Sequence, residues 1–231
     1  MSKFWELRPT RLPMLSAGSM ASLDELFELI VATRGTQRLP ADRMWIARRD
    51  PPRDRQTDFV QAALDLMGPQ VSDSDFEGFF ARLGGRIAGA NIHRLQNYRP
   101  EFWSRISELT EKVASHSGNS IKRWDLDTFF GTYRVTPFGA HRDHASVFSF
   151  CLKGERIYCT WPPDYPWDAN DLHTPDPDRL ARHLEKAEQF LVKAGQLFYW
   201  PSNRWHLVLS DGSPSVVVQA SAYIPGAAKS S

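Results

Sequence analysis

The chain has 231 residues, of which 42% are hydrophobic and 24% are charged, and its formal net charge is +1 at pH 7. This length accommodates one domain with a substantial buried core. The nearly balanced charge argues against wholesale binding to nucleic acid or to a membrane surface. No signal peptide, long apolar segment or internal repeat is visible, so we expect a soluble, cytoplasmic protein.

The part of the chain at residues 1–120 is predicted to elaborate the outside of a catalytic core. Its first twenty residues contain proline breaks and are expected to form an irregular arm. Ser22 and Glu25 form a capping-box pattern before a run with helical spacing. Further helices are predicted at residues 57–67, at residues 72–83 and from Pro100 onward, and short strands at residues 44–47 and 90–98.

The catalytic core is predicted at residues 121–226, followed by a flexible tail at residues 227–231. After an aromatic-rich strand come two apolar runs, VFSFCL and RIYCTW, which the intervening Gly154 predicts to be a hairpin. Residues 162–178 are rich in proline and are interpreted as a lid or substrate-binding rim, with a solvated connection as the alternative. A short helix is then predicted at residues 178–190, and further strands at residues 197–200 and 216–223.

The two cysteines, Cys151 and Cys159, both lie in the runs predicted as a hairpin. We interpret them as small buried hydrophobic residues. Two thiols in a barrel wall suit a reducing cytoplasm.

His141 and Asp143 stand two positions apart on a predicted strand, so their side chains point to the same face while Arg142 points away. His206 lies on a later strand-like segment, which a barrel or jelly roll can bring beside the first. Two imidazoles and one carboxylate form the facial triad of non-haem Fe(II) oxygenases, which leaves coordination positions open. A structural zinc site is instead closed by four ligands, usually including thiolates.

Four other histidines compete for the metal. His144 has the strand parity opposite to Asp143 and is interpreted as a surface residue, or one that supports the ligands. His173 and His183 are expected to be solvated, and His93 has no evident partner. None of them replaces His206 as the third ligand.

The segment from His141 to Pro163 resembles the JmjC/cupin-like Fe(II)/2-oxoglutarate-dependent oxygenases. The members it resembles include the asparaginyl hydroxylase that acts on hypoxia-inducible factor and the ribosomal-protein hydroxylases. These proteins carry a basic residue fifteen positions after the first histidine, a position that Arg156 occupies here. Residues 195–206 are similar to the strand-and-corner signature of the family, with Gln196 in place of its usual acidic residue.

The resemblance implies a mainly β fold, namely a double-stranded β-helix (jelly-roll, cupin-like) barrel with N-terminal helices packed outside. It implies Fe(II), 2-oxoglutarate and dioxygen as cofactors. The metal ligands and catalytic residues that it implies are His141, Asp143 and His206. Arg156 is expected to bind the far carboxylate of 2-oxoglutarate, because a guanidinium forms two parallel hydrogen bonds with a carboxylate. Further hydrogen bonds to this carboxylate are predicted from Thr132 or Tyr133 and from Gln219.

Relatives hydroxylate protein or peptide side chains, so we expect hydroxylation of an unactivated C–H bond on a peptide or protein. The chain ends soon after the last predicted strand, which leaves no room for the C-terminal helical dimerisation or winged-helix modules of several protein hydroxylases. A tailoring hydroxylase of a small amino-acid-derived metabolite is therefore an alternative, and either a monomer or a homodimer is expected.

Two readings without this chemistry stay open. One is a catalytically silent JmjC-like or cupin-like binding module, and the other is a cupin that uses its metal without 2-oxoglutarate. The presence of all three ligand positions and of Arg156 argues against both.

Overall fold

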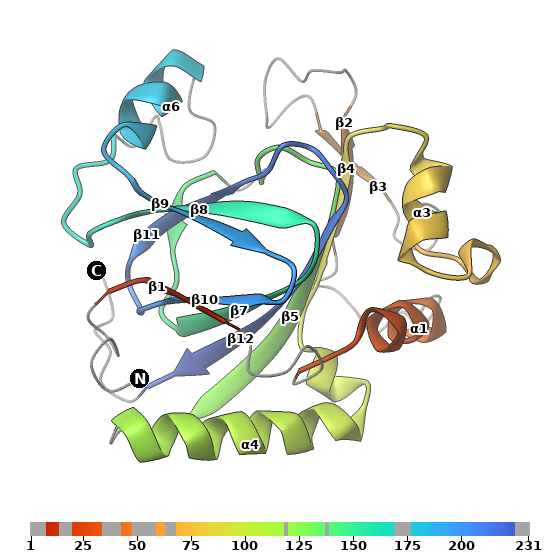
Figure 1. The fold of residues 1–231 in the computed structure, drawn as a ribbon, viewed down its shortest axis with the longest axis horizontal. Helices are drawn as coiled ribbons and strands as arrows, with labels where there is room; N and C mark the ends of the chain where they lie inside the picture. Colours follow the sequence, from red (N-terminus) through yellow and green to blue (C-terminus); the bar gives the residue numbers. More distant parts are fainter. Residues whose placement is uncertain are drawn as a thin grey trace.

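The computed structural model describes residues 8–13, 20–33, 43–47, 59–62, 68–117, 120–136, 139–168 and 177–224. Two antiparallel β-sheets face each other, with helices outside them (Figure 1). The large sheet contains, in spatial order, β1 (Thr10–Pro13), β10 (Gln196–Trp200), β7 (Ser146–Lys153), β12 (Ser215–Tyr223), β5 (Arg123–Gly131), β4 (Ala88–Ile92), β2 (Arg43–Ala47) and β3 (Phe59–Ala62). The small sheet contains β6 (His141–Arg142), β11 (Trp205–Leu209), β8 (Glu155–Trp161) and β9 (Glu188–Lys193).

From β5 onward the chain passes repeatedly between the two sheets. The strands β5, β7, β10 and β12 lie in the large sheet, whereas β6, β8, β9 and β11 lie in the small one. This alternation encloses a barrel and defines a jelly roll, or double-stranded β-helix. The predicted fold class is therefore confirmed, with β1 and the β2–β4 group extending the large sheet on either side.

Two helix ends lie where the sequence signals predict them. The helix α1 (Leu23–Thr33) begins with the predicted capping box, in which Ser22 and Glu25 exchange hydrogen bonds of 2.8 and 3.1 Å. The helix α3 (Phe76–Leu83) ends at Gly84, whose φ of 61° is readily adopted by glycine. The remaining helical elements are α4 (Pro100–Ser117), α6 (Pro177–Leu184) and the short 3₁₀ turns η1 (Val71–Asp73) and η2 (Leu95–Asn97).

The predicted hairpin of β7 and β8 is wrong, because the two strands lie in different sheets. β7 pairs with β10 and β12, whereas β8 pairs with β9 and β11. Gly154, with a φ of 72°, forms the corner at which the chain crosses from one sheet to the other. Residues 146–151 of β7 are all buried, since this strand has the helices on one side and the small sheet on the other.

Three other expectations need correction. The helix predicted at residues 57–67 contains β3, whose pairing with β2 overrides local helix propensity. The helix predicted at residues 178–190 ends at Leu184, and its second half enters β9, where Phe190 and Val192 alternate toward the barrel core. The described part of the N-terminal arm forms β1. Residues 169–176 of the predicted loop and the tail at 227–231 lie outside the described residues.

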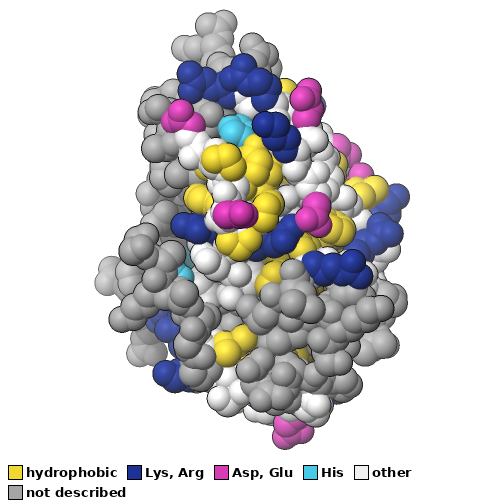
Figure 2. Space-filling model, turned by 90° about the vertical axis from the view of Figure 1, so that its left-hand side faces the viewer, with side chains coloured by type: hydrophobic (Ala, Val, Ile, Leu, Met, Phe, Trp, Pro, Cys, Tyr) yellow, Lys and Arg dark blue, Asp and Glu magenta, His cyan; other side chains and the backbone are white. Residues whose placement is uncertain are grey.

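Three apolar clusters hold these layers together. The largest lies between the large sheet and the helices α1, α3 and α4, and includes Phe79 and Phe130. The second fills the barrel interior around Phe198. The third lies between the small sheet and α6 around Trp161. Seen from the side on which α6 lies, hydrophobic side chains gather among lysine and arginine side chains (Figure 2).

Both cysteines are buried, as predicted. Burial raises the pKa of the Cys151 thiol to about 11 and that of Cys159 to about 12. The thiols are therefore protonated at neutral pH and behave as small apolar groups. Within the described part of the chain, no helix has the length and hydrophobicity of a membrane span.

Candidate metal centre

The three predicted metal ligands converge at one end of the barrel. His141 on β6 and His206 on β11 are directly opposite each other, and their ring centroids are 4.2 Å apart. Asp143 follows β6, and its two carboxylate oxygens lie 4.0 Å from Nε2 of His141 and 3.5 Å from Nε2 of His206. One ligand atom from each residue lies within 4.8 Å of the other two. Adjacent ligand atoms around one first-row metal ion are about 3 Å apart, so a small movement of these three side chains would bring them to the distances of a metal site.

Backbone carbonyl groups orient both imidazoles. The Nδ1 atom of His141 lies 3.2 Å from the carbonyl oxygen of Gly139, and the Nδ1 atom of His206 lies 3.2 Å from that of Arg204. A carbonyl oxygen only accepts, so each Nδ1 donates a hydrogen, and Nε2 is the nitrogen that faces Asp143. Metal-binding histidines characteristically use their second nitrogen in this way.

The neighbours of the ligands hold the local backbone. Arg142 points to the outer face of the small sheet, where its Cζ atom lies 4.6 Å from the ring centroid of Trp205. The amide of Asn203 donates a 2.6 Å hydrogen bond to the carbonyl oxygen of Asp143. Asn203 itself adopts a φ of 61°, in the corner before β11. The two loops that carry Asp143 and His206 are thereby joined.

Burial differs strongly among the ligands. The side chain of His206 is 4% exposed, whereas those of His141 and Asp143 are 37% and 40% exposed. Burial and the proximity of His141 lower the pKa of His206 to about 4, so its imidazole is neutral near pH 7 and able to bind a metal. Solvent is therefore excluded on the His206 side of the centre, whereas the side formed by His141 and Asp143 is open to solvent.

Arg156 is buried deep in the same barrel. It is only 1% exposed, and its Cζ atom lies 4.4 Å from the ring centroid of Tyr133. Its Nε and Nη2 atoms have no hydrogen-bond partner. Arg156 precedes Thr160, the residue opposite His206, by four positions on β8, so their side chains share one face and their Cα atoms are about 13 Å apart. An unpaired buried guanidinium calls for an anionic ligand.

The other predicted cosubstrate contacts have different surroundings. The Thr132 hydroxyl donates to the carbonyl oxygen of Arg86 at 2.7 Å and accepts from the amide of Ala88 at 3.1 Å, so it anchors the start of β4. Tyr133 is brought beneath Arg156. Gln219 lies on β12, opposite Ser149 in the neighbouring strand. The roles of these residues toward a cosubstrate stay predictions.

The competing histidines form no second metal cluster among the described residues. His93 does have partners, because Nδ1 lies 3.2 Å from Asp127 and Nε2 lies 2.6 Å from the Asn91 amide. His183 is half-buried, not solvated: its ring stacks on Trp167 at 4.1 Å. His144 is exposed, and His173 lies outside the described residues.

Two buried residues beside His206 were not singled out from the sequence. Thr160 is its cross-strand neighbour on β8, and the ring centroid of Trp200 lies 5.0 Å from that of His206. The Thr160 hydroxyl and the Trp200 indole nitrogen both lack a hydrogen-bond partner. The pairing register of β8 and β11 reveals the proximity of Thr160, and the packing of the two sheets reveals that of Trp200.

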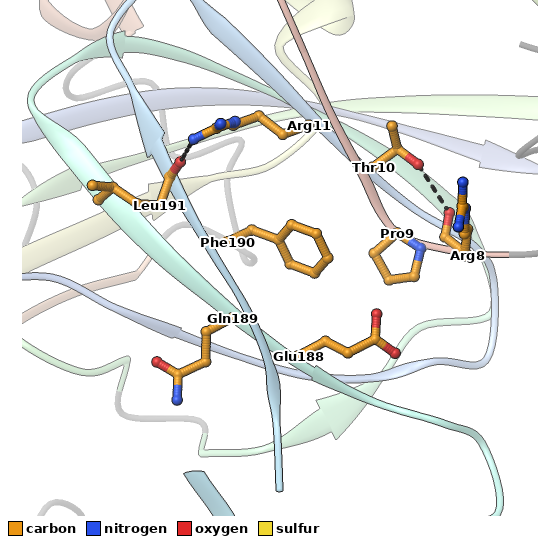
Figure 3. A pocket seen from close by; sticks show the side chains of 8 residues that line it. All are labelled: Arg8, Pro9, Thr10, Arg11, Glu188, Gln189, Phe190 and Leu191. Atoms are coloured by element: carbon orange, nitrogen blue, oxygen red, sulfur yellow. Dashed lines mark hydrogen bonds between the residues drawn. The ribbon is translucent and has the colours of Figure 1, made fainter. Parts of the chain in front are cut away.

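A cavity of about 500 Å³ lies at the seam between β1 and β9, where it is lined by residues 8–11 and 188–191 (Figure 3). Arg11 crosses this seam and donates a 2.8 Å hydrogen bond to the carbonyl oxygen of Leu191. The lining includes no metal ligand and does not include Arg156. We assign the seam a role in closing the barrel.

The donor set suits a divalent first-row metal with positions left open. Two imidazoles and one carboxylate on one side of an ion are the ligands of non-haem Fe(II) oxygenases. The unpaired guanidinium on the same interior face suits a ligand that carries a second carboxylate. The residues present therefore fit both Fe(II) and 2-oxoglutarate.

The topology defines a jelly roll, or double-stranded β-helix, and the triad lies at one end of its barrel. Among solved structures, the chain is similar to ycfD from Escherichia coli, with a TM-score of 0.57 and 14% sequence identity over 97% of this chain and 52% of that one. It is also similar to the ribosomal oxygenase YcfD from Escherichia coli in complex with cobalt and 2-oxoglutarate, with a TM-score of 0.56 and 13% identity over 96% of this chain and 50% of that one.

These similarities establish the fold. The chain spans about half the length of the solved structures that it matches. No protein-family model matches the chain, and no curated protein matches it in sequence.

Proposed function

We propose that this chain is an Fe(II)- and 2-oxoglutarate-dependent oxygenase that hydroxylates an unactivated C–H bond, on a peptide or protein side chain. The observation that carries the proposal is a shared interior face. His206 and Thr160 lie at one end of this face, and the unpaired Arg156 lies at the other. A metal centre and a buried cation on one interior face suit a small ligand that binds the metal through one end and carries a carboxylate at the other.

His141, Asp143 and His206 would hold the metal. Fe(II) held there with 2-oxoglutarate would supply the chemistry of dioxygen activation. In this reaction 2-oxoglutarate is oxidised to succinate and carbon dioxide, and the second oxygen atom enters the substrate C–H bond. The contribution of the chain is orientation, because the carbonyl groups of Gly139 and Arg204 fix the two imidazoles.

Arg156 would bind the far carboxylate of the cosubstrate. Its guanidinium offers parallel N–H donors, and the Tyr133 ring supports its face. The barrel interior is apolar, and the buried Val192 lies opposite Arg156 on β9. Such surroundings exclude water and strengthen the ion pair.

The substrate would approach the open side of the centre, where His141 and Asp143 are each more than one-third exposed. A peptide or protein substrate is supported by the similarity to a structure described as a ribosomal oxygenase. A small amino-acid-derived metabolite is the alternative substrate, and screening both classes for hydroxylated product distinguishes them.

The experiment that tests the proposal is anaerobic titration of the Fe(II)-loaded protein with 2-oxoglutarate. A metal-to-ligand charge-transfer band in the visible range is expected, and Arg156→Ala should require far more 2-oxoglutarate to produce it. Lys193→Ala, at an exposed lysine on β9, is the matched control and should titrate like the wild type. Iron binding without the band would overturn the proposal in favour of a cupin with other chemistry or a binding module.

A further inference from the structure

Among the residues that the structure describes, three buried side chains on β8 and β10 carry polar atoms without a hydrogen-bond partner. They are Arg156, through Nε and Nη2, Thr160, through Oγ1, and Trp200, through Nε1. Each of these side chains belongs to a residue that is at most 1% exposed. A buried donor without a partner lowers stability, so its presence in a folded protein requires an explanation such as a ligand.

Thr160 and Trp200 border the same metal ligand from two different sheets. Thr160 is directly opposite His206 in the β8–β11 pair, so the two Cβ atoms are about 5 Å apart on one face. Trp200 belongs to β10 of the large sheet, and its ring centroid lies 5.0 Å from that of His206. His141 occupies the remaining cross-strand position beside His206. The two unpaired groups therefore lie at the metal end of the interior.

The inner face of β8 alternates between unpaired and paired groups. Arg156 and Thr160 are unpaired, but Tyr158 between them shares a 2.6 Å hydrogen bond with Ser149. Burial raises the pKa of Tyr158, so its hydroxyl stays protonated. The face thus offers free donors at its two ends and none in its middle.

This pattern defines the chemistry of the ligand. Indole and guanidinium nitrogens only donate, whereas a hydroxyl can donate or accept. A ligand that satisfies all three side chains needs acceptor oxygens at both ends and an apolar middle. The dianion of 2-oxoglutarate has a carboxylate at each end, a keto oxygen beside one of them, and two methylene groups between.

We propose that Thr160 and Trp200 donate hydrogen bonds to the metal-end carboxylate of 2-oxoglutarate, while Arg156 binds the far one. This inference rests on the proposed function, and it adds two binding residues to it. The two donors would thereby fix the orientation of the 2-oxo acid group beside His206.

The test uses the full chain loaded with Fe(II) under anaerobic conditions. Thr160→Val and Trp200→Phe should each weaken 2-oxoglutarate binding by about tenfold or more and shift the charge-transfer band, since each removes a hydrogen bond to a charged group. Thr160→Ser keeps the hydroxyl and should behave like the wild type. Thr128→Val is the matched control, because Thr128 is equally buried but its hydroxyl already donates to the carbonyl oxygen of Val217 at 2.9 Å.

A second probe separates the two ends of the site. The compound 2-oxobutyrate keeps the metal-binding 2-oxo acid group but lacks the far carboxylate. Thr160→Val should weaken both ligands by the same factor, whereas Arg156→Ala should weaken 2-oxoglutarate alone. Unchanged affinity and band position in both Thr160→Val and Trp200→Phe would overturn the inference and leave the proposed function intact. Failure of the wild type to bind 2-oxoglutarate would overturn both.

Discussion

His206 lies directly opposite His141 across the β6–β11 pair, with the two ring centroids 4.2 Å apart. The two histidines have unequal support. His206 belongs to a five-residue strand that pairs on both sides, whereas His141 belongs to a two-residue strand at the edge of the small sheet. His206 is therefore the fixed point of the centre, and His141 and Asp143 adjust around it.

Asp143→Ala should abolish turnover and lower metal affinity by more than 100-fold, because the variant retains only two ligands. Losses of about 10–100-fold are typical when only a residue that supports a ligand is removed. Cobalt(II) titration followed by visible absorption measures the affinity without requiring turnover. Asp164→Ala, at an exposed aspartate after β8, is the control and should bind cobalt normally. Near-normal succinate formation by Asp143→Ala would refute the assignment.

Arg156→Met should bind 2-oxoglutarate at least 100-fold more weakly and yet be as stable as the wild type, or more so. The substitution replaces an unpaired buried charge by an apolar side chain of similar length, which can raise the free energy of unfolding by about 1–2 kcal/mol. Thermal melts with and without 2-oxoglutarate check both effects, since a ligand raises the melting temperature only when it binds the folded state. A less stable variant that keeps the ligand-induced shift would contradict the prediction.

Much of this architecture was predictable from local patterns. The positions of His141 and Asp143 on alternate residues, the capping box at Ser22 and the stop at Gly84 each depend on a few neighbouring residues. Such local signals act within one turn or one strand.

The features that the sequence did not predict depend on tertiary contacts. A glycine turn such as that at Gly154 is compatible with a hairpin and with a crossing to the other sheet. The crossing occurs here because β7 is buried between two layers. Residues 185–190 carry charges at helical spacing, but pairing with β8 makes residues 188–190 part of a strand. Thr160 approaches His206 only through strand register, and Trp200 only through the packing of the two sheets.

Gly154→Ala should be far more destabilising than Gly195→Ala. A Cβ atom at Gly154 would lie 2.4 Å from the carbonyl oxygen of Pro214, and φ is +72°. At Gly195 φ is +81°, but a Cβ atom would have no neighbour within 4 Å. We expect a loss of about 1–2 kcal/mol at Gly195 from the backbone conformation alone, and about 3 kcal/mol or more at Gly154 from the added clash. Urea denaturation measures both losses, and equal values would disprove the role of Gly154 as a packed corner.

Glu25 should stabilise the docking of α1 on α4 in a pH-dependent manner. Arg105 donates hydrogen bonds of 2.5 and 2.9 Å to the Glu25 carboxylate, and these bonds lower the pKa of Glu25 from its ordinary value to about 2. Because the folded-state pKa is lowered, the stabilisation is present above pH 4.5 and is lost as the pH falls toward 2.

Glu25→Gln should therefore lower the free energy of unfolding by about 1–2 kcal/mol at pH 7, a value reduced for solvent screening because the side chains are 31% and 25% exposed. The difference from the wild type should shrink when urea denaturation is repeated at pH 3. The glutamine retains an oxygen for the capping bond to the Ser22 amide, so the variant tests mainly the ion pair. Glu111→Gln, at an exposed position on α4, should show no such dependence on pH. A Glu25→Gln effect of the same size at both pH values would indicate packing, and not charge, as its origin.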